Sequence, residues 1–318
     1  MKRIVANPIF IIVVLLFISA CSDFLDIEPQ GRVNESGLAT KDGVESLLIG
    51  AYAMLDGISN GFGNPAAASL WNSAASNWVY GSIAGTDAHK GSYPADYSTI
   101  NSIEQYNAGP TNAMFNDKWR AIYEGVARAN SVLIVLNQVT DASVDTTRVR
   151  AEARVLRGIY HFEALKLWGS VPYINEYVDP NVAKNDKEIW PQVVADLKSG
   201  YVNLSEKMDA IGRINKWVAA AFYAKALLFQ GKYNDAYPIL NEIYSNGKNP
   251  LGVKYDLMPS FSDNFNVETE NNSESVFAFQ YSVNDGSNGD NGAFGEAFNF
   301  PNGQGPGGCC GFFQPSSE

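Results

Sequence analysis

The chain has 318 residues, of which 23 are lysine or arginine and 34 are aspartate or glutamate, so its formal net charge is −11. An acidic surface repels phosphate groups, so nucleic acid is not an expected partner. Contact between the domain surface and anionic lipid is disfavoured for the same reason. Aromatic residues make up 12% of the chain and charged residues 18%. This composition is typical of a globular domain that buries a sizeable core, not of a disordered stalk.

The N-terminus has the pattern of a bacterial lipoprotein signal. Two basic residues precede ten unbroken apolar residues, 9–18, and a small Ser-Ala pair stands directly before Cys21. A run of ten is well short of the roughly 20 residues that span a bilayer as a helix. The sequence therefore predicts a signal peptide over residues 1–20 and lipidation of Cys21. The alternative is a soluble periplasmic protein with a chance cysteine.

Cleavage before Cys21 leaves residues 21–34 as a lipid-anchored tether in front of a domain that covers residues 35–318. It removes two basic and no acidic side chains, so 21 basic and 34 acidic residues remain and the net charge becomes −13. Several acyl chains on one cysteine give stable membrane attachment. We therefore expect the lipid, not the protein surface, to hold the chain to the membrane.

The remaining cysteines and the two histidines offer little for catalysis or metal binding. Cys309 and Cys310 are adjacent, so they can pair only through a strained ring, and two ordinary loop thiols are the simpler expectation. His89 and His161 lie far apart and in no ligand spacing. We therefore expect no metal site, no cofactor and no nucleophilic catalytic group. His161 lies in an apolar helical run, which favours a packed core position.

Apolar residues spaced at i, i+3 and i+4 predict several long helices. The first covers residues 41–56, with Thr40 as its N-cap and Gly57 as its stop. Three more are expected over residues 115–139, 146–168 and 187–205. The helix over residues 146–168 is apolar around so much of its circumference that neighbours must cover it on more than one side.

Residues 217–250 have the clearest repeat pattern. Ala224 lies on a first helix, Gly231 marks a tight turn, and Ala236 lies on a second helix. This spacing is typical of a 34-residue tetratricopeptide unit, although any helical hairpin can imitate it. One unit cannot bury its own face, so the preceding helices should stack against it. The sequence thus predicts a mainly α fold with tetratricopeptide-like helices over about residues 115–247.

Two regions lack this helical pattern. Residues 57–113 are rich in Gly, Ala, Ser and Asn and carry scattered aromatic residues, and residues 284–318 are rich in Gly, Asn and Phe. A loop as long as the first is usually functional or contains unrecognised structure, and we expect part of it, about residues 66–79, to be helical. A short strand is predicted over residues 275–282.

Several segments, taken in order, resemble one known family. They are the CSDFLD run that begins at Cys21, residues 119–130 (WRAIYEGVARAN), residues 151–172 (AEARVLRGIYHFEALKLWGSVP), the helical pair in 217–250, the ESVF run at 274–277, and the glycine-rich approach to Gln314 and Pro315. The chain is on these grounds similar to the SusD/RagB family, surface lipoproteins of the Bacteroidota that work in glycan uptake. The closing segment, 311–318, resembles the opening of a family motif that leads into a further helix, so we expect the chain to be incomplete at its C-terminus.

The resemblance implies a SusD-like α-α superhelix and a protein that binds without catalysing. It implies a lipid-anchored, cell-surface protein of the outer membrane, which captures an oligosaccharide and delivers it to a SusC-like, TonB-dependent transporter. The family builds its ligand surface from loops at the two irregular regions, 57–113 and 284–318. Only these loop positions can be carried over, because no residue motif matches.

The residues of the first loop have the chemistry that a glycan site needs. Sugars present apolar C–H faces and hydroxyl edges, so flat aromatic rings beside amides and carboxylates suit them. The candidate ligand-binding residues are Trp78, Tyr80, Tyr93, Tyr97, Asn77 and Asp87. A second aromatic set could close over them: Phe294, Phe298, Phe300, Phe312 and Phe313. For any single ring, packing in the core or anchoring of the loop is the simpler interpretation.

Two other functions compete with glycan binding. A glycoside hydrolase needs two carboxylates roughly 5 to 9 Å apart, and none of the many acidic residues sits in a recognisable catalytic arrangement. A tetratricopeptide-like scaffold would instead hold a protein partner without touching glycan. The identity of the glycan, and which aromatic rings would contact it, cannot be read from one sequence.

We predict that Cys21→Ala abolishes membrane association without unfolding the domain, because the acyl chains and not the acidic surface provide attachment. Cys309→Ala is the matched control and should remain in the membrane fraction. Detergent partition of cell fractions measures both variants. A Cys21→Ala protein that still partitions with the outer membrane would contradict lipid anchoring.

Overall fold

The computed structural model describes most of the chain from Ser36 onward. The described residues are 36–57, 73, 76–282, 284–286, 299 and 311–316. The predicted signal peptide, the tether and all three cysteines lie outside them, as does most of the helix expected at 66–79.

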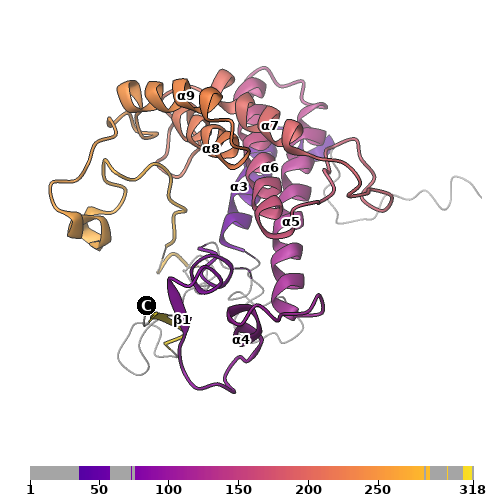
Figure 1. The fold of residues 1–318 in the computed structure, drawn as a ribbon. Coiled ribbons are helices and arrows are strands. Elements are labelled where there is room, and N and C mark those ends of the chain that lie inside the picture. Colours follow the sequence, from indigo (N-terminus) through magenta and orange to yellow (C-terminus); the bar gives the residue numbers. More distant parts are fainter. Residues whose placement is uncertain are drawn as a thin grey trace, which may run out of the picture.

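Six helices of 13 to 24 residues make up the main body (Figure 1). They are α3 (Lys41–Ala53), α5 (Ala113–Leu136), α6 (Thr146–Trp168), α7 (Trp190–Asn203), α8 (Lys216–Phe229) and α9 (Tyr233–Asn246). Each lies where its apolar spacing predicts a helix, with bounds that differ by a few residues at most ends. Thr40 caps α3 by accepting a hydrogen bond from the Gly43 N–H, and Gly57 follows with φ of 101°. The fold is therefore mainly α, as predicted.

The helices pack in chain order. α5 contacts α6, α6 contacts α7, α7 contacts α8 and α8 contacts α9, while α3 lies against both α5 and α6. Each helix therefore buries its face mainly against its neighbours in sequence, which is the arrangement of a helical repeat stack.

Two glycines let these helices approach closely. A Cβ on Gly125 of α5 would lie 2.5 Å from the ring of Tyr160 on α6. A Cβ on Gly200 of α7 would lie 2.3 Å from Val155 and 2.7 Å from Ala219. The Tyr160 hydroxyl also donates to the carbonyl of Ala51 at 2.5 Å, so one α6 side chain connects α3, α5 and α6.

α6 is buried on nearly every side, as its sequence predicts, and it carries charged residues into the core. Arg157 is 4% exposed and donates to both carboxylate oxygens of Asp196 on α7, at 2.8 and 2.9 Å. It also donates to Glu176 at 2.5 Å and to the Asn130 amide oxygen on α5 at 2.9 Å. Asp196 in turn accepts from the Tyr173 hydroxyl at 2.7 Å.

A second ionic cluster joins α6 to α3 and to the loop before α8. Glu152 is fully buried and accepts hydrogen bonds from the Tyr52 hydroxyl at 2.5 Å, from Arg148 at 2.5 Å and from Arg213 at 3.3 Å. Both arginines also bind Glu45 on α3. Two carboxylates thus share two guanidinium groups, which compensates the buried charge.

His161 is a core residue, as predicted. It is fully buried, its Nδ1 donates to the Arg157 carbonyl at 3.0 Å, and its Nε2 accepts from the Ile174 N–H at 3.1 Å. Burial lowers the pKa of this imidazole to about 4. The ring is therefore neutral at physiological pH and joins α6 to the following loop.

The α8–α9 pair has the predicted repeat geometry. Ala224 and Ala236 are both fully buried and belong to one apolar cluster with Leu227 and Ile239. Gly231 makes the turn between the helices with φ of 69°. The N-terminus of α8 is capped by Asn215, whose amide oxygen accepts from the N–H groups of two residues in the first turn.

A smaller unit lies at the N-terminal end of α5 (Figure 1). It contains a π-helical turn (Val79–Ile83), β1 (Ala88–Lys90), α4 (Thr99–Glu104) and β2 (Phe313–Pro315). We refer to it as the small lobe. The region 57–113, read from sequence as a long loop, thus contains regular structure that its short, polar segments did not reveal.

The strand predicted over residues 275–282 does not form. These residues carry no ladder hydrogen bonds in the described chain; Phe277 instead packs onto the helices as part of the surroundings of the main core. Among the described residues no helix combines the length and the hydropathy needed to cross a bilayer.

Enlarging the small residues between α8 and α9 should overpack their contact. We expect Ala224→Phe and Ala236→Phe each to destabilise the fold by about 1–3 kcal/mol and to lower the melting temperature. Ala127→Phe is the control, because Ala127 is exposed on α5. Thermal melts followed by circular dichroism measure all three, and wild-type melting temperatures for both buried variants would refute the close packing.

Removing the carboxylate of Asp196 should leave the Arg157 guanidinium with less compensation for its burial. We expect Asp196→Ala to lower the free energy of unfolding by roughly 3–5 kcal/mol, measured by urea titration. The exposed ion pair between Arg128 and Glu124 provides the comparison, because Glu124→Ala removes only this pair and should cost about 0–1 kcal/mol. Equal effects of the two substitutions would contradict a structural role for the buried pair.

Candidate functional site

The small lobe brings together the two regions that the sequence predicts as ligand loops. β1 and β2 pair antiparallel, with Ala88 opposite Pro315, His89 opposite Gln314 and Lys90 opposite Phe313. The Gly91 N–H extends the pairing by donating to the Phe312 carbonyl at 2.8 Å. Residues separated by more than two hundred positions in sequence therefore form one surface.

Aromatic rings from both regions pack against each other inside this lobe. Tyr97 stacks on Phe312 with ring centroids 6.0 Å apart, and the edge of Trp78 meets Phe313 at 6.4 Å. Phe312 is 1% exposed and Trp78 is 3% exposed. Phe312 and Phe313 of the second aromatic region therefore lie against rings of the first, whereas Phe294, Phe298 and Phe300 lie outside the described residues.

Two of the candidate rings, Trp78 and Tyr80, pack against other parts of the protein. Trp78 contributes to the apolar cluster of the lobe, and the Tyr80 hydroxyl donates to the Met114 carbonyl at 2.6 Å. Burial raises the pKa of Tyr80 far above its ordinary value. In this conformation both rings form the base of the lobe, not its outer face.

The exposed candidates lie around the β1–β2 edge. Tyr93 is 65% exposed and Phe313 is 40% exposed. Tyr97 is half-buried, and Asp87 is exposed immediately before β1. The exposed carboxylate of Asp87 and the exposed ring of Tyr93 thus lie on either side of β1 in the sequence.

Lys90 fixes the position of Tyr93, a role that the sequence did not suggest. Its side chain is 3% exposed, its Nζ donates to the Tyr93 carbonyl at 3.0 Å, and it lies 5.1 Å above the centre of the Phe312 ring. Burial lowers the pKa of this ammonium group. The carbonyl contact connects the exposed loop to the aromatic interior.

Unusual backbone conformations gather in the lobe. Seven described non-glycine residues have positive φ, and five of them lie between positions 77 and 106: Asn77, Thr86, Ser92, Tyr97 and Tyr106. Such conformations cost about 1–3 kcal/mol each and cluster at functional sites. This concentration of positive-φ residues distinguishes the lobe from the helical stack, where the backbone conformations are those of regular helices.

A groove runs beside the β1–β2 pair and has a volume of about 350 Å³. Its lining residues are Ile83, Thr86, Ala88, His89, Glu104, Pro315 and Ser316. His89 Nδ1 and Glu104 Oε1 are 2.6 Å apart. The groove therefore offers apolar surface and hydrogen-bonding groups of both kinds at the meeting point of the two regions.

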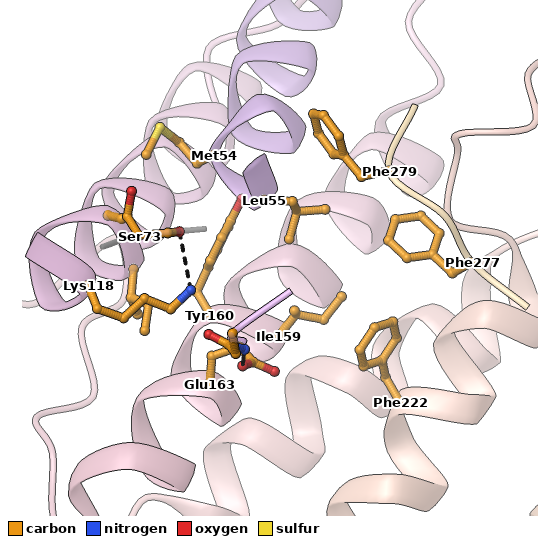
Figure 2. Close-up of a pocket in the computed structure, with 13 residues that line it drawn as sticks. Met54, Leu55, Ser73, Lys118, Ile159, Tyr160, Glu163, Phe222, Phe277 and Phe279 are labelled. Atoms are coloured by element: carbon orange, nitrogen blue, oxygen red, sulfur yellow. Dashed lines mark hydrogen bonds between the residues drawn. The ribbon is translucent and has the colours of Figure 1, made fainter. Parts of the chain in front are cut away.

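Asn77 does not line the groove; it lines a separate cleft together with residues of the helical stack. Figure 2 shows other residues of this cleft. Its Nδ2 donates to Glu163 Oε2 on α6 at 2.9 Å. Nearby, Lys118 on α5 donates to the Ser73 carbonyl at 3.2 Å. The candidate residues from one sequence region are thus divided between two concave surfaces.

The opposite wall of this cleft consists of residues that the sequence did not single out. Figure 2 shows Phe222, Phe277 and Phe279 in a column facing Lys118 and Glu163. The alternation of Phe277 and Phe279 was the available signal, because residues two apart in an extended segment share a face. The sequence predicts a strand over residues 275–282, whereas in the structure Phe277 and Phe279 line a cleft.

Neither surface resembles a metal site. Within the parts of the chain that the structure describes, no three His, Cys, Asp or Glu side chains come close enough to hold an ion.

The family model described as "Starch-binding associating with outer membrane", a SusD-like model, matches residues 23–228. A SusD-like protein of Bacteroides ovatus is 26% identical over 282 residues, which cover 84% of this chain and 48% of that protein. SusD-like protein P25 of Formosa agariphila is 22% identical and covers 93% of this chain and 56% of its own length. The chain spans about half the length of the curated relatives it matches.

Solved structures agree with these matches. A laminarin-binding SusD-like protein superposes with a TM-score of 0.62 at 25% identity, covering 75% of this chain and 50% of that one. Surface glycan-binding protein A from Bacteroides thetaiotaomicron, in complex with laminarihexaose, gives a TM-score of 0.61 at 25% identity, with 76% and 49% covered. Both similarities cover most of this chain and half of the other protein.

Proposed function

Because the chain belongs to the SusD-like family, we propose that it is a cell-surface lipoprotein that binds an oligosaccharide and passes it to a SusC-like, TonB-dependent transporter of the outer membrane. The laminarihexaose complex of a structural relative supports glycan as the ligand class. Attachment would be through lipidated Cys21. The protein would act by binding alone, with no catalytic step.

The observation that carries this proposal is the meeting of the two aromatic regions at the β1–β2 pair. Tyr93 and Phe313 are exposed on the outside of the lobe, while Trp78 and Tyr80 form its packed base. A rigid base reduces the entropy that the exposed rings lose on binding. The groove beside them supplies the carboxylate of Glu104 and the imidazole of His89 for sugar hydroxyl groups.

Charge favours a neutral ligand at this face. The lobe carries the carboxylates of Asp87, Asp96 and Glu104, whereas its lysine, Lys90, is buried beneath the surface. A uronate or sulfated glycan would meet repulsion here. A neutral oligosaccharide such as the laminarihexaose of the relative is the better fit.

We expect Tyr93→Ala and Phe313→Ala each to weaken oligosaccharide binding by about 1–3 kcal/mol, as at other aromatic stacking platforms. Tyr177→Ala is the matched control, because Tyr177 is 78% exposed outside the lobe. Isothermal titration with laminarihexaose and a panel of neutral plant and microbial oligosaccharides measures the change. Trp78→Ala should instead lower the melting temperature, because it removes a buried ring.

Unchanged affinity in both Tyr93→Ala and Phe313→Ala, with the fold intact, would move the site away from the lobe. If no glycan binds the wild-type chain, the alternative of a tetratricopeptide-like scaffold gains support. Release of reducing sugar by the wild-type protein would identify an enzyme in place of a binding protein.

A further inference from the structure

We propose that the cleft of Figure 2 is a second ligand site, separate from the lobe surface, which holds one neutral sugar unit at the end of a glycan chain. This inference rests on the proposed function for the class of ligand. Its residues come from α5, α6, α8, the turn after α3, the segment before the π-helical turn and the extended segment near residue 278, and none of them lines the β1–β2 groove.

The apolar wall suits the C–H face of a sugar ring. Phe222 and Phe277 meet edge to face with centroids 6.1 Å apart, and Phe279 continues the column (Figure 2). Leu55 and Ile159 lie between this wall and the polar end. The three phenylalanines are half-buried, so their rings are partly accessible and already held in place.

The polar end of the cleft contains a buried hydrogen-bond acceptor that has no donor, the amide oxygen of Asn77. Asn77 Oδ1 is shielded from solvent and has no hydrogen-bond partner, although the Nδ2 of the same amide donates to Glu163. A buried unsatisfied acceptor destabilises the folded chain, because it has lost its hydrogen bonds to water and gained none in return. Asn77 is also held at φ of 52°, a left-handed conformation that asparagine adopts at some cost. A ligand hydroxyl donating to Oδ1 would relieve the first of these penalties.

The charges of the cleft balance. Lys118 and Glu163 are the charged residues that line it, and they carry opposite signs. Glu163 is further compensated by Lys166 at 2.7 Å. A net charge on the ligand would therefore gain little, whereas hydroxyl groups can both donate to a carboxylate and accept from an ammonium group.

The size of the cleft allows only one sugar ring of the ligand to enter. Its volume is about 210 Å³, below the roughly 300–1,000 Å³ of pockets that enclose drug-sized ligands. An extended oligosaccharide does not fit inside. A chain can enter only by its terminal unit, with the remaining units outside the cleft.

The test uses isothermal titration of the chain with free D-glucose, D-galactose, D-mannose and with laminarihexaose. We expect Asn77→Ala and Phe279→Ala each to weaken binding of at least one hexose by about tenfold, equivalent to about 1.4 kcal/mol. Phe261→Ala is the matched control, because Phe261 is 78% exposed in the segment before residue 278. Melting curves verify that both cleft variants are folded. Asn77→Ala also removes the hydrogen bond to Glu163 and places alanine at a φ of 52°, so Phe279→Ala is the less disruptive of the two.

The outcomes separate this inference from the proposed function. If the cleft variants weaken both the free hexose and laminarihexaose, the site holds a chain terminus; if they weaken the free hexose alone, it holds a monosaccharide and the chain-end assignment is overturned. Oligosaccharide binding that responds to Tyr93→Ala and to neither cleft variant would overturn the second site while leaving the proposed function intact. Absence of any sugar binding to the wild-type chain would overturn both.

Discussion

The burial of α6 on nearly every side is the constraint on which the structure depends. A helix covered in this way must compensate each charged side chain that it carries, and α6 carries Glu152 and Arg157. Their partners come from α3, α5, α7 and the loops around the stack. Neutral His161 adds a further connection to the loop after α6. Because unpaired buried charge is costly, these contacts restrict how the neighbouring helices can be placed around α6.

The small lobe benefits from this rigid stack. It lies at the N-terminal end of α5, and Met114 in the first turn of that helix both packs in the lobe's cluster and accepts the Tyr80 hydroxyl. The lobe, with its strained residues and exposed rings, is thus attached to α5. This attachment reduces the conformational entropy that the rings lose when a ligand binds. The cleft of Figure 2 lies where lobe and stack meet, so a ligand there would contact both parts.

The helices could be predicted because apolar periodicity is local information, and α6 is found at the predicted residues. The lobe could be predicted only as a pair of interacting regions. β1 and β2 have three residues each, too few for a recognisable alternation, and their pairing depends on residues far apart in sequence. Trp78 and Tyr93 are both aromatic residues in the same irregular stretch of sequence, yet Trp78 is 3% exposed and Tyr93 is 65% exposed. Burial of this kind is decided by tertiary packing, so no single-sequence pattern distinguishes a base ring from a surface ring.

The pairing of β1 with β2 also has a consequence for folding. The helices can form from contacts between neighbours as the chain is made, whereas the β1–β2 pair joins two segments that have α5, α6, α7, α8 and α9 between them in the sequence. Closing so long a loop has an entropic cost that only a few backbone hydrogen bonds and the Phe312 contacts repay directly. The lobe should therefore be the last unit to assemble and the first to open, with amide exchange at β1 faster than in α6. The proposed ligand surface then lies on the least stable unit, where binding would add stability.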